Sequence, residues 1–72
     1  MDHAECIKVI EKAAREGATE LDLSSKRLTA LPAEIGQLSG LTDLDLRGNQ
    51  LSSLPAEIGQ LSGLTNLSLS FN

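Results

Sequence analysis

The chain has 72 residues, which is enough for one small domain whose folding buries only about 60% of the surface that the unfolded chain exposes. Six basic and ten acidic residues give a net charge of −4. With no basic stripe and one aromatic residue, this composition argues against nucleic-acid binding. The apolar runs are too short to cross a membrane. A single cysteine, Cys6, excludes an internal disulfide and indicates a reducing, cytoplasmic setting.

Residues 1–17 have the pattern of a capping helix. Asp2 is the predicted N-cap, and Glu5, three residues later, completes a capping box. Apolar residues recur at helical spacing, namely Cys6, Ile7, Ile10, Ala13 and Ala14. Gly17 follows as a stop signal at the C-terminal end. We expect a helix over residues 2–16 whose apolar stripe covers the open end of the structure that follows.

Residues 18–72 are built from a unit that recurs at a 23-residue offset. The string Leu-Pro-Ala-Glu-Ile-Gly-Gln-Leu-Ser-Gly-Leu occurs at 31–41 and again at 54–64. Two full units are followed by the first nine residues of a third. Such a period is the signature of a repeat architecture, in which each unit packs on its neighbours.

Each unit begins with alternating apolar and polar residues, which is the period of a β-strand. The segments are Leu21-Asp22-Leu23, Leu44-Asp45-Leu46 and Leu67-Ser68-Leu69. Since the offset is constant, we expect these strands to stack in parallel and in register. Asn49 lies where the chain turns, and its amide is expected to satisfy backbone groups of neighbouring coils. Pro55 and Gly59 disfavour a long helix, so we expect extended backbone or short 3₁₀ turns on the convex side.

The unit resembles the leucine-rich repeat family, whose pattern is L-x-x-L-x-L-x-x-N-x-L. The resemblance covers residues 18–72, and the first unit departs from it at Ala18 and Lys26. It implies an α/β fold: a leucine-rich repeat solenoid with parallel strands on the concave face and an N-terminal capping helix. The LPxEIGxLxxL spacing is similar to the N-terminal repeats of Roco-type proteins, which precede a GTPase domain. It is also similar to free-standing bacterial repeat proteins and to Ras-binding scaffold repeats.

The sequence contains no motif for catalysis or for a cofactor. No GxxxxGK[ST], GxGxxG, HExxH or GxSxG string occurs. His3 is the only histidine, and we expect it to be solvated at the N-terminus. Cys6 is better explained by packing on the helix than by a reactive thiol. We therefore expect neither enzymatic activity nor a bound metal or cofactor.

The outward residues of stacked strands form rows, with neighbouring strands about 4.8 Å apart. Four carboxylates then crowd one end of the concave face, and we interpret this face as a docking surface for a basic protein partner. Its candidate residues are Glu20, Asp22, Asp43, Asp45, Arg47, Asn66 and Ser68. The alternative is a solvated face whose charge Arg47 partly compensates. A calcium site is a weaker interpretation, because no cage of loop carbonyls is evident.

The strand at residues 66–70 is expected at the edge of the sheet, with unpaired backbone groups along one side. Such an edge is a template for pairing with another chain. Leu67, Leu69 and Phe71 lie beside it. One interpretation is a homodimer in which two copies of this strand pair antiparallel. The other is that further repeats or a fused domain cover this end.

Together these features predict a noncovalent protein-interaction or scaffolding module, part of a larger protein, with neither nucleic acid nor membrane as a partner. Two other interpretations stay open. One is the regulatory N-terminal region of a Roco-type GTPase. The other is a structural chain that associates with itself.

Overall fold

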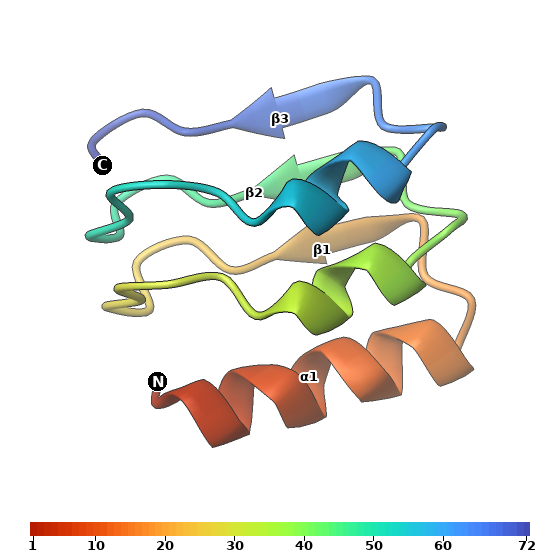
Figure 1. The fold of residues 1–72 in the computed structure, drawn as a ribbon, viewed down its shortest axis with the longest axis horizontal. Helices are drawn as coiled ribbons and strands as arrows, with labels where there is room; N and C mark the ends of the chain where they lie inside the picture. The colour runs from red at the N-terminus through yellow and green to blue at the C-terminus, as the bar shows by residue number, and fades with distance from the viewer.

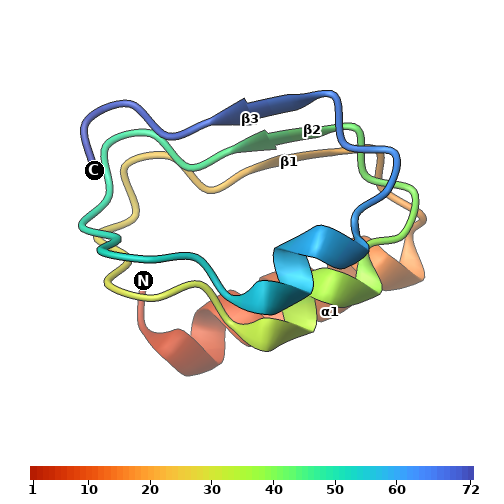
Figure 2. The same cartoon turned by 45° about the horizontal axis from the view of Figure 1, so that its top comes forward.

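The computed structural model describes residues 1–72 and contains two layers (Figure 2). One layer holds three strands: β1 (Glu20–Asp22), β2 (Asp43–Asp45) and β3 (Asn66–Ser68). The other holds helix α1 (His3–Arg15) and the 3₁₀ helices η1 (Ala33–Gln37) and η2 (Ala56–Gln60). The expected 3₁₀ turns are therefore present, while the strand expected over 66–70 is shorter. None of the helices has the length and apolar character that crossing a bilayer requires.

The three strands form one parallel sheet in the order β1-β2-β3 (Figure 1). The register pairs residues 23 positions apart, so that Leu21 lies beside Leu44 and Leu44 beside Leu67. The predicted parallel, in-register stacking is thus confirmed. It follows directly from the constant length of the repeat, since a strand returns to the same level only if each unit is equally long.

Both ends of α1 form as the sequence predicts. The Asp2 carboxylate accepts a hydrogen bond from the Glu5 N–H at 2.7 Å, and the Glu5 carboxylate accepts one from the Asp2 N–H at 3.4 Å. This is the capping box. At the other end the Ala18 N–H donates to the Ala13 carbonyl at 3.0 Å, around Gly17 in the left-handed conformation. This Schellman arrangement turns the chain out of the helix and into β1.

A single apolar core lies between the two layers. Helix α1 contributes Cys6, Ile10 and Ala13, and it lies beside η1 in the same layer (Figures 1 and 2). The rest of the core comes from the strands and return segments: Leu23, Leu28, Leu31, Ile35, Leu38, Leu41, Leu44, Leu46, Leu51 and Leu61. Burial raises the pKa of the Cys6 thiol, which keeps it neutral. The structure thus supports packing as the role of Cys6.

The buried side chain of Asn49 joins the second coil to the first. Its Nδ2 donates to the carbonyls of Leu46 at 2.9 Å and Leu23 at 2.8 Å. Its Oδ1 accepts from the N–H groups of Lys26 and Leu28, both at 3.0 Å. One amide therefore satisfies four backbone groups of two coils, which confirms the expected role of this asparagine.

The side chain of Asn72 likewise joins the third coil to the second. Its Nδ2 donates to the carbonyls of Leu46 at 2.7 Å and Leu69 at 3.0 Å, while its Oδ1 accepts from the Leu51 N–H at 3.0 Å. Both asparagines reach back to the coil that precedes them. The first unit follows a helix and not another coil, which explains why Lys26 can replace asparagine there.

The turn after each strand places an equivalent residue in the left-handed region. These residues are Ser25, Gly48 and Phe71, with φ of 54°, 72° and 64°. Only the second is a glycine, the residue that adopts this conformation without steric cost. A Cβ atom at Gly48 would also lie 2.9 Å from the Ser25 Oγ, so this position is crowded as well as conformationally restricted.

We therefore expect Gly48→Ala to destabilise the domain by about 1–2 kcal/mol, because alanine is strained at positive φ and its Cβ meets Ser25. Gly40→Ala is the matched control: nothing lies within 4 Å of the added Cβ, and its φ is outside the left-handed region. Urea denaturation of the two variants measures the difference. Equal midpoints would contradict this account of the turn.

Candidate functional site

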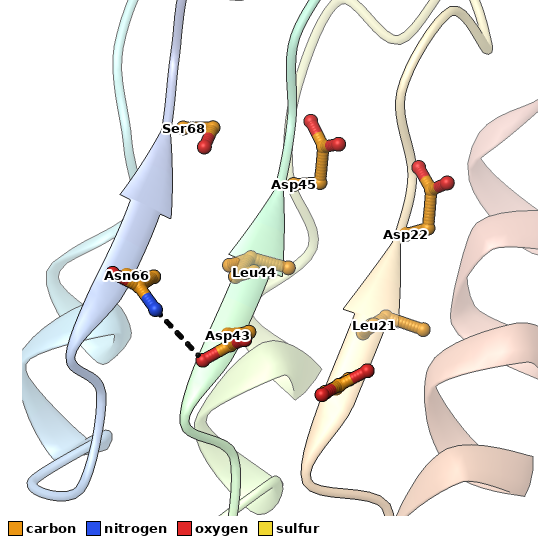
Figure 3. Close-up of a pocket in the computed structure, with 8 residues that line it drawn as sticks. Leu21, Asp22, Asp43, Leu44, Asp45, Asn66 and Ser68 are labelled. Carbon is orange, nitrogen blue, oxygen red and sulfur yellow. Dashed lines mark hydrogen bonds between the residues drawn. The ribbon is translucent and has the colours of Figure 1, made fainter.

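Polar residues of all three strands line one open hollow of about 270 Å³ (Figure 3). They are Glu20, Asp22, Asp43, Asp45, Asn66 and Ser68, and we call this set the outer sheet face. The backbone register places them in two rows across the sheet. Neighbouring residues within a row are 23 positions apart in the sequence. In Figure 3 the Asp22 and Asp45 carboxylates lie side by side on the same side of the sheet. Six of the seven residues singled out in the sequence thus line one surface.

The seventh residue, Arg47, does not line this hollow. Its guanidinium binds the Asp45 carboxylate through two hydrogen bonds, Nε to Oδ1 at 2.9 Å and Nη2 to Oδ2 at 2.7 Å. This ion pair lowers the pKa of Asp45 and raises that of Arg47. Arg47 therefore neutralises one carboxylate at the edge of the outer sheet face, as the solvated-face alternative supposed.

The Asp22 carboxylate also accepts hydrogen bonds at the end of its own strand. Its Oδ1 accepts from the Ser24 hydroxyl at 2.6 Å and from the Ser24 N–H at 2.9 Å. These hydrogen bonds lower the pKa of Asp22. The Arg47 N–H donates to Asp45 in the same way, at 3.1 Å. An aspartate side chain that accepts a hydrogen bond from the backbone N–H two residues later closes a turn. The Asp-x-Ser and Asp-x-Arg strings were therefore signals in the sequence for this local role.

The other two carboxylates have fewer partners. Asp43 Oδ1 accepts one hydrogen bond, at 3.2 Å, from the Asn66 amide of the next strand (Figure 3). Glu20 is exposed and makes no hydrogen bond within the chain. The only ion pair of the structure is the one between Arg47 and Asp45. Three carboxylates of the outer sheet face, those of Glu20, Asp22 and Asp43, thus lack a cationic partner.

The lowered pKa values of Asp22 and Asp45 set the pH range over which their turns are stabilised. A carboxyl whose pKa is lower in the folded state than in the unfolded one stabilises the fold above its ordinary pKa, which is 3.8 here. That contribution is lost as the pH falls through the lowered folded value. Both carboxylates accordingly stay ionised, and the outer sheet face stays acidic, at neutral pH.

The arrangement suits electrostatic binding. No group of three His, Cys, Asp or Glu side chains lies in a position to hold a metal ion. The hydroxyl and amide groups near the carboxylates, those of Ser24, Ser68 and Asn66, have no histidine or lysine base bonded to them. What the face offers is an array of hydrogen-bond acceptors with unbalanced negative charge, held on the rigid backbone of three paired strands.

The family comparison agrees with the repeat architecture. The profile of the leucine rich repeat family matches residues 16–72, which begins directly after α1 and covers all three strands. No curated protein matches the chain.

Proposed function

The chain belongs to the leucine-rich repeat family, and we propose that it binds a basic protein segment on the outer sheet face. Repeats of this family generally act as protein-interaction modules and are typically not enzymes. The observation that carries the proposal is the group of three carboxylates without a cationic partner, on adjacent strands around one hollow. A lysine or arginine side chain of a partner would supply the missing charge.

The strand backbone supports this role by fixing where the carboxylates lie. Glu20 and Asp43 are paired in the register of β1 and β2, so their Cα atoms are held one strand spacing apart. Preorganised charges bind a partner at a smaller entropic cost than charges on mobile loops. Electrostatic complementarity of this kind raises the association rate and favours basic partners over acidic ones.

The test compares two double variants with the same change of net charge. Glu20→Gln with Asp43→Asn removes charge from the outer sheet face, whereas Glu11→Gln with Glu16→Gln removes it from exposed positions outside this face. With a lysine-rich peptide as the probe, we expect the first pair to weaken binding by roughly tenfold. Titration calorimetry at low and high salt measures this.

Binding should also weaken as salt rises, because the contacts are exposed ion pairs. The second double variant should bind like the original chain. If both double variants lose affinity equally, the peptide is attracted by net charge alone. The outer sheet face would then be only a solvated surface.

We also propose that the repeats form a solenoid for which α1 is the N-terminal cap. The cap is supported by the burial of Cys6, Ile10 and Ala13 and by the contact of α1 with η1. Its other side carries exposed charges at Lys8, Glu11, Lys12 and Arg15. Terminal units of repeat proteins need such a polar outer surface, because no further coil packs on them.

A finer assignment is the regulatory repeat region of a Roco-type GTPase. It is supported by the LPxEIGxLxxL strings, which form η1 and η2 in two consecutive coils. In that case the outer sheet face would bind a segment of the same large protein or of its regulator. A GxxxxGK[ST] motif encoded in the same reading frame after Asn72 would support this assignment, and a stop codon there would contradict it.

A further inference from the structure

We propose that the basic segment bound by the outer sheet face also carries an acidic side chain, which binds in a second hollow beside Arg47. This inference rests on the proposed function, because it describes the partner of the same surface more closely. The partner is then a segment of mixed charge and not a uniformly basic one. Three features of the turns that follow β1 and β2 carry the inference.

The first feature is the gathering of basic residues at one end of the sheet. Of the six basic residues of the chain, three belong to α1. The others lie in the turns after β1 and β2, and they are Lys26, Arg27 and Arg47. Since the strands are parallel, these turns lie at the same end of the sheet (Figure 1). No acidic residue occurs within residues 23–33 or 46–56, so the surface is acidic along the strands and basic beyond their ends.

The second feature is the number of hydrogen-bond donors that the turns leave free. A guanidinium has five N–H donors. Arg47 uses Nε and Nη2 to bind Asp45, so both N–H groups of Nη1 have no partner within the chain. The hydroxyl of Ser24 donates to Asp22, whereas that of Ser25 makes no hydrogen bond. Lys26 and Arg27 form no ion pair.

The third feature is a hollow of about 190 Å³ between the two turns, which we call the turn hollow. It is lined by Ser24, Ser25, Arg47, Gly48 and Phe71. The lack of a side chain at Gly48 leaves the Ser25 hydroxyl uncovered, since a Cβ atom at Gly48 would lie 2.9 Å from the Ser25 Oγ. A carboxylate in the turn hollow would meet a guanidinium and a free hydroxyl, and none of the lining residues is acidic.

Lys26 adds positive charge near the turn hollow. The pKa of Asp22 is lowered mainly by its hydrogen bonds from Ser24 and to a smaller extent by the charge of Lys26. Lys26 therefore lies close enough to act on the end of β1. An acidic side chain bound beside Ser24 and Ser25 would be attracted by Lys26 as well as by Arg47.

The two binding places are a fixed distance apart along the sheet. Arg47 follows Asp43 by four residues, which is about 13 Å at roughly 3.3 Å per residue of extended chain. A bound segment that runs extended along the strands covers the same distance in four residues. A lysine beside Glu20 and Asp43 thus places the fourth residue after it, or before it, at the turn hollow.

Two peptides test the inference by calorimetric titration. Both are rich in Gly and Ser and carry two adjacent lysines, followed four residues later by glutamate in one peptide and by glutamine in the other. We expect the glutamate peptide to bind the chain roughly two- to fivefold more tightly. Attraction by net charge alone gives the opposite order, because a chain with a charge of −4 repels an added carboxylate. A glutamate peptide that binds no more tightly than the glutamine peptide would overturn the inference.

Arg47→Gln tests where the glutamate binds. In this variant the glutamate peptide should lose its advantage over the glutamine peptide. The change also frees Asp45, but Asp45 then attracts the lysines of both peptides, so the comparison between the peptides still holds. Lys12→Gln removes the same charge from the exposed side of α1 and should keep the preference for glutamate. A preference that survives Arg47→Gln, or that Lys12→Gln abolishes equally, would contradict the assignment.

The glutamine peptide separates this inference from the proposed function. If Glu20→Gln with Asp43→Asn weakens its binding while the two peptides bind the original chain equally, the outer sheet face binds basic segments and only the further inference fails. If the double variant binds the glutamine peptide as tightly as the original chain does, the proposed function fails and this inference fails with it.

Discussion

Replacing Ile10 with aspartate is expected to lower the free energy of unfolding of the whole chain by about 3–5 kcal/mol. Ile10 is 0% exposed and is one of the three residues that α1 contributes to the core. The substitution removes its packing and buries a carboxylate that no cation can pair with. Small domains have only about 0.05–0.15 kcal/mol of stability per residue, so this loss is a large fraction of the stability of the whole chain.

Urea denaturation followed by circular dichroism measures the effect of Ile10→Asp. The matched control is Lys8→Asp, which introduces the same residue on the exposed side of the same helix. The control should change stability by well under 1 kcal/mol. If Ile10→Asp melts only the helical signal and leaves the unfolding of the repeats unchanged, α1 is not a cap that the repeats depend on.

Replacing Asn49 with alanine should cost about 2–4 kcal/mol. The change removes four hydrogen bonds and leaves buried backbone groups unsatisfied in two coils, among them the Leu28 N–H of the first coil and the Leu46 carbonyl of the second. Since those groups belong to different coils, the loss should uncouple the first coil from the second. Hydrogen exchange of the Leu28 amide should accelerate more than that of amides within α1.

The control for Asn49 is its neighbour Gln50→Ala. Gln50 is exposed, and its side chain makes no hydrogen bond within the chain, so this variant should be nearly neutral. Asn49→Asp adds a further test, because a carboxylate cannot donate to the two carbonyls that Nδ2 now binds. Its stability should be no higher than that of the alanine variant. An Asn49→Ala protein as stable as Gln50→Ala would contradict the role assigned to this amide.

The repeat made most of the fold predictable. A constant 23-residue offset fixes the register of Leu21, Leu44 and Leu67 without any knowledge of side-chain conformations. The capping box at Asp2 and Glu5 is a local pattern of two residues, and it forms as expected. Periodicity and local capping specify backbone positions, and these are the features that the sequence predicted well.

The details of the site were less predictable because they depend on side-chain conformation. The outward positions of Asp22 and Asp45 follow from alternation, but their hydrogen bonds to Ser24 and Arg47 depend on rotamers. Arg47 was expected within the acidic surface and instead lies at its edge, bound to Asp45. Its side chain is long enough to fold back on its own strand end, which the spacing of residues alone does not show.

The most direct test of the proposed binding face is to map the contact of a lysine-rich peptide on the isotopically labelled chain by NMR. The account predicts shift changes concentrated at the amides of β1 and β2, around Glu20, Asp22 and Asp43, that disappear at high salt. The exposed acidic residues elsewhere, such as Glu11 and Glu16 on and beside α1, should be unaffected. Shift changes spread evenly over Glu11, Glu16 and the strands would contradict it.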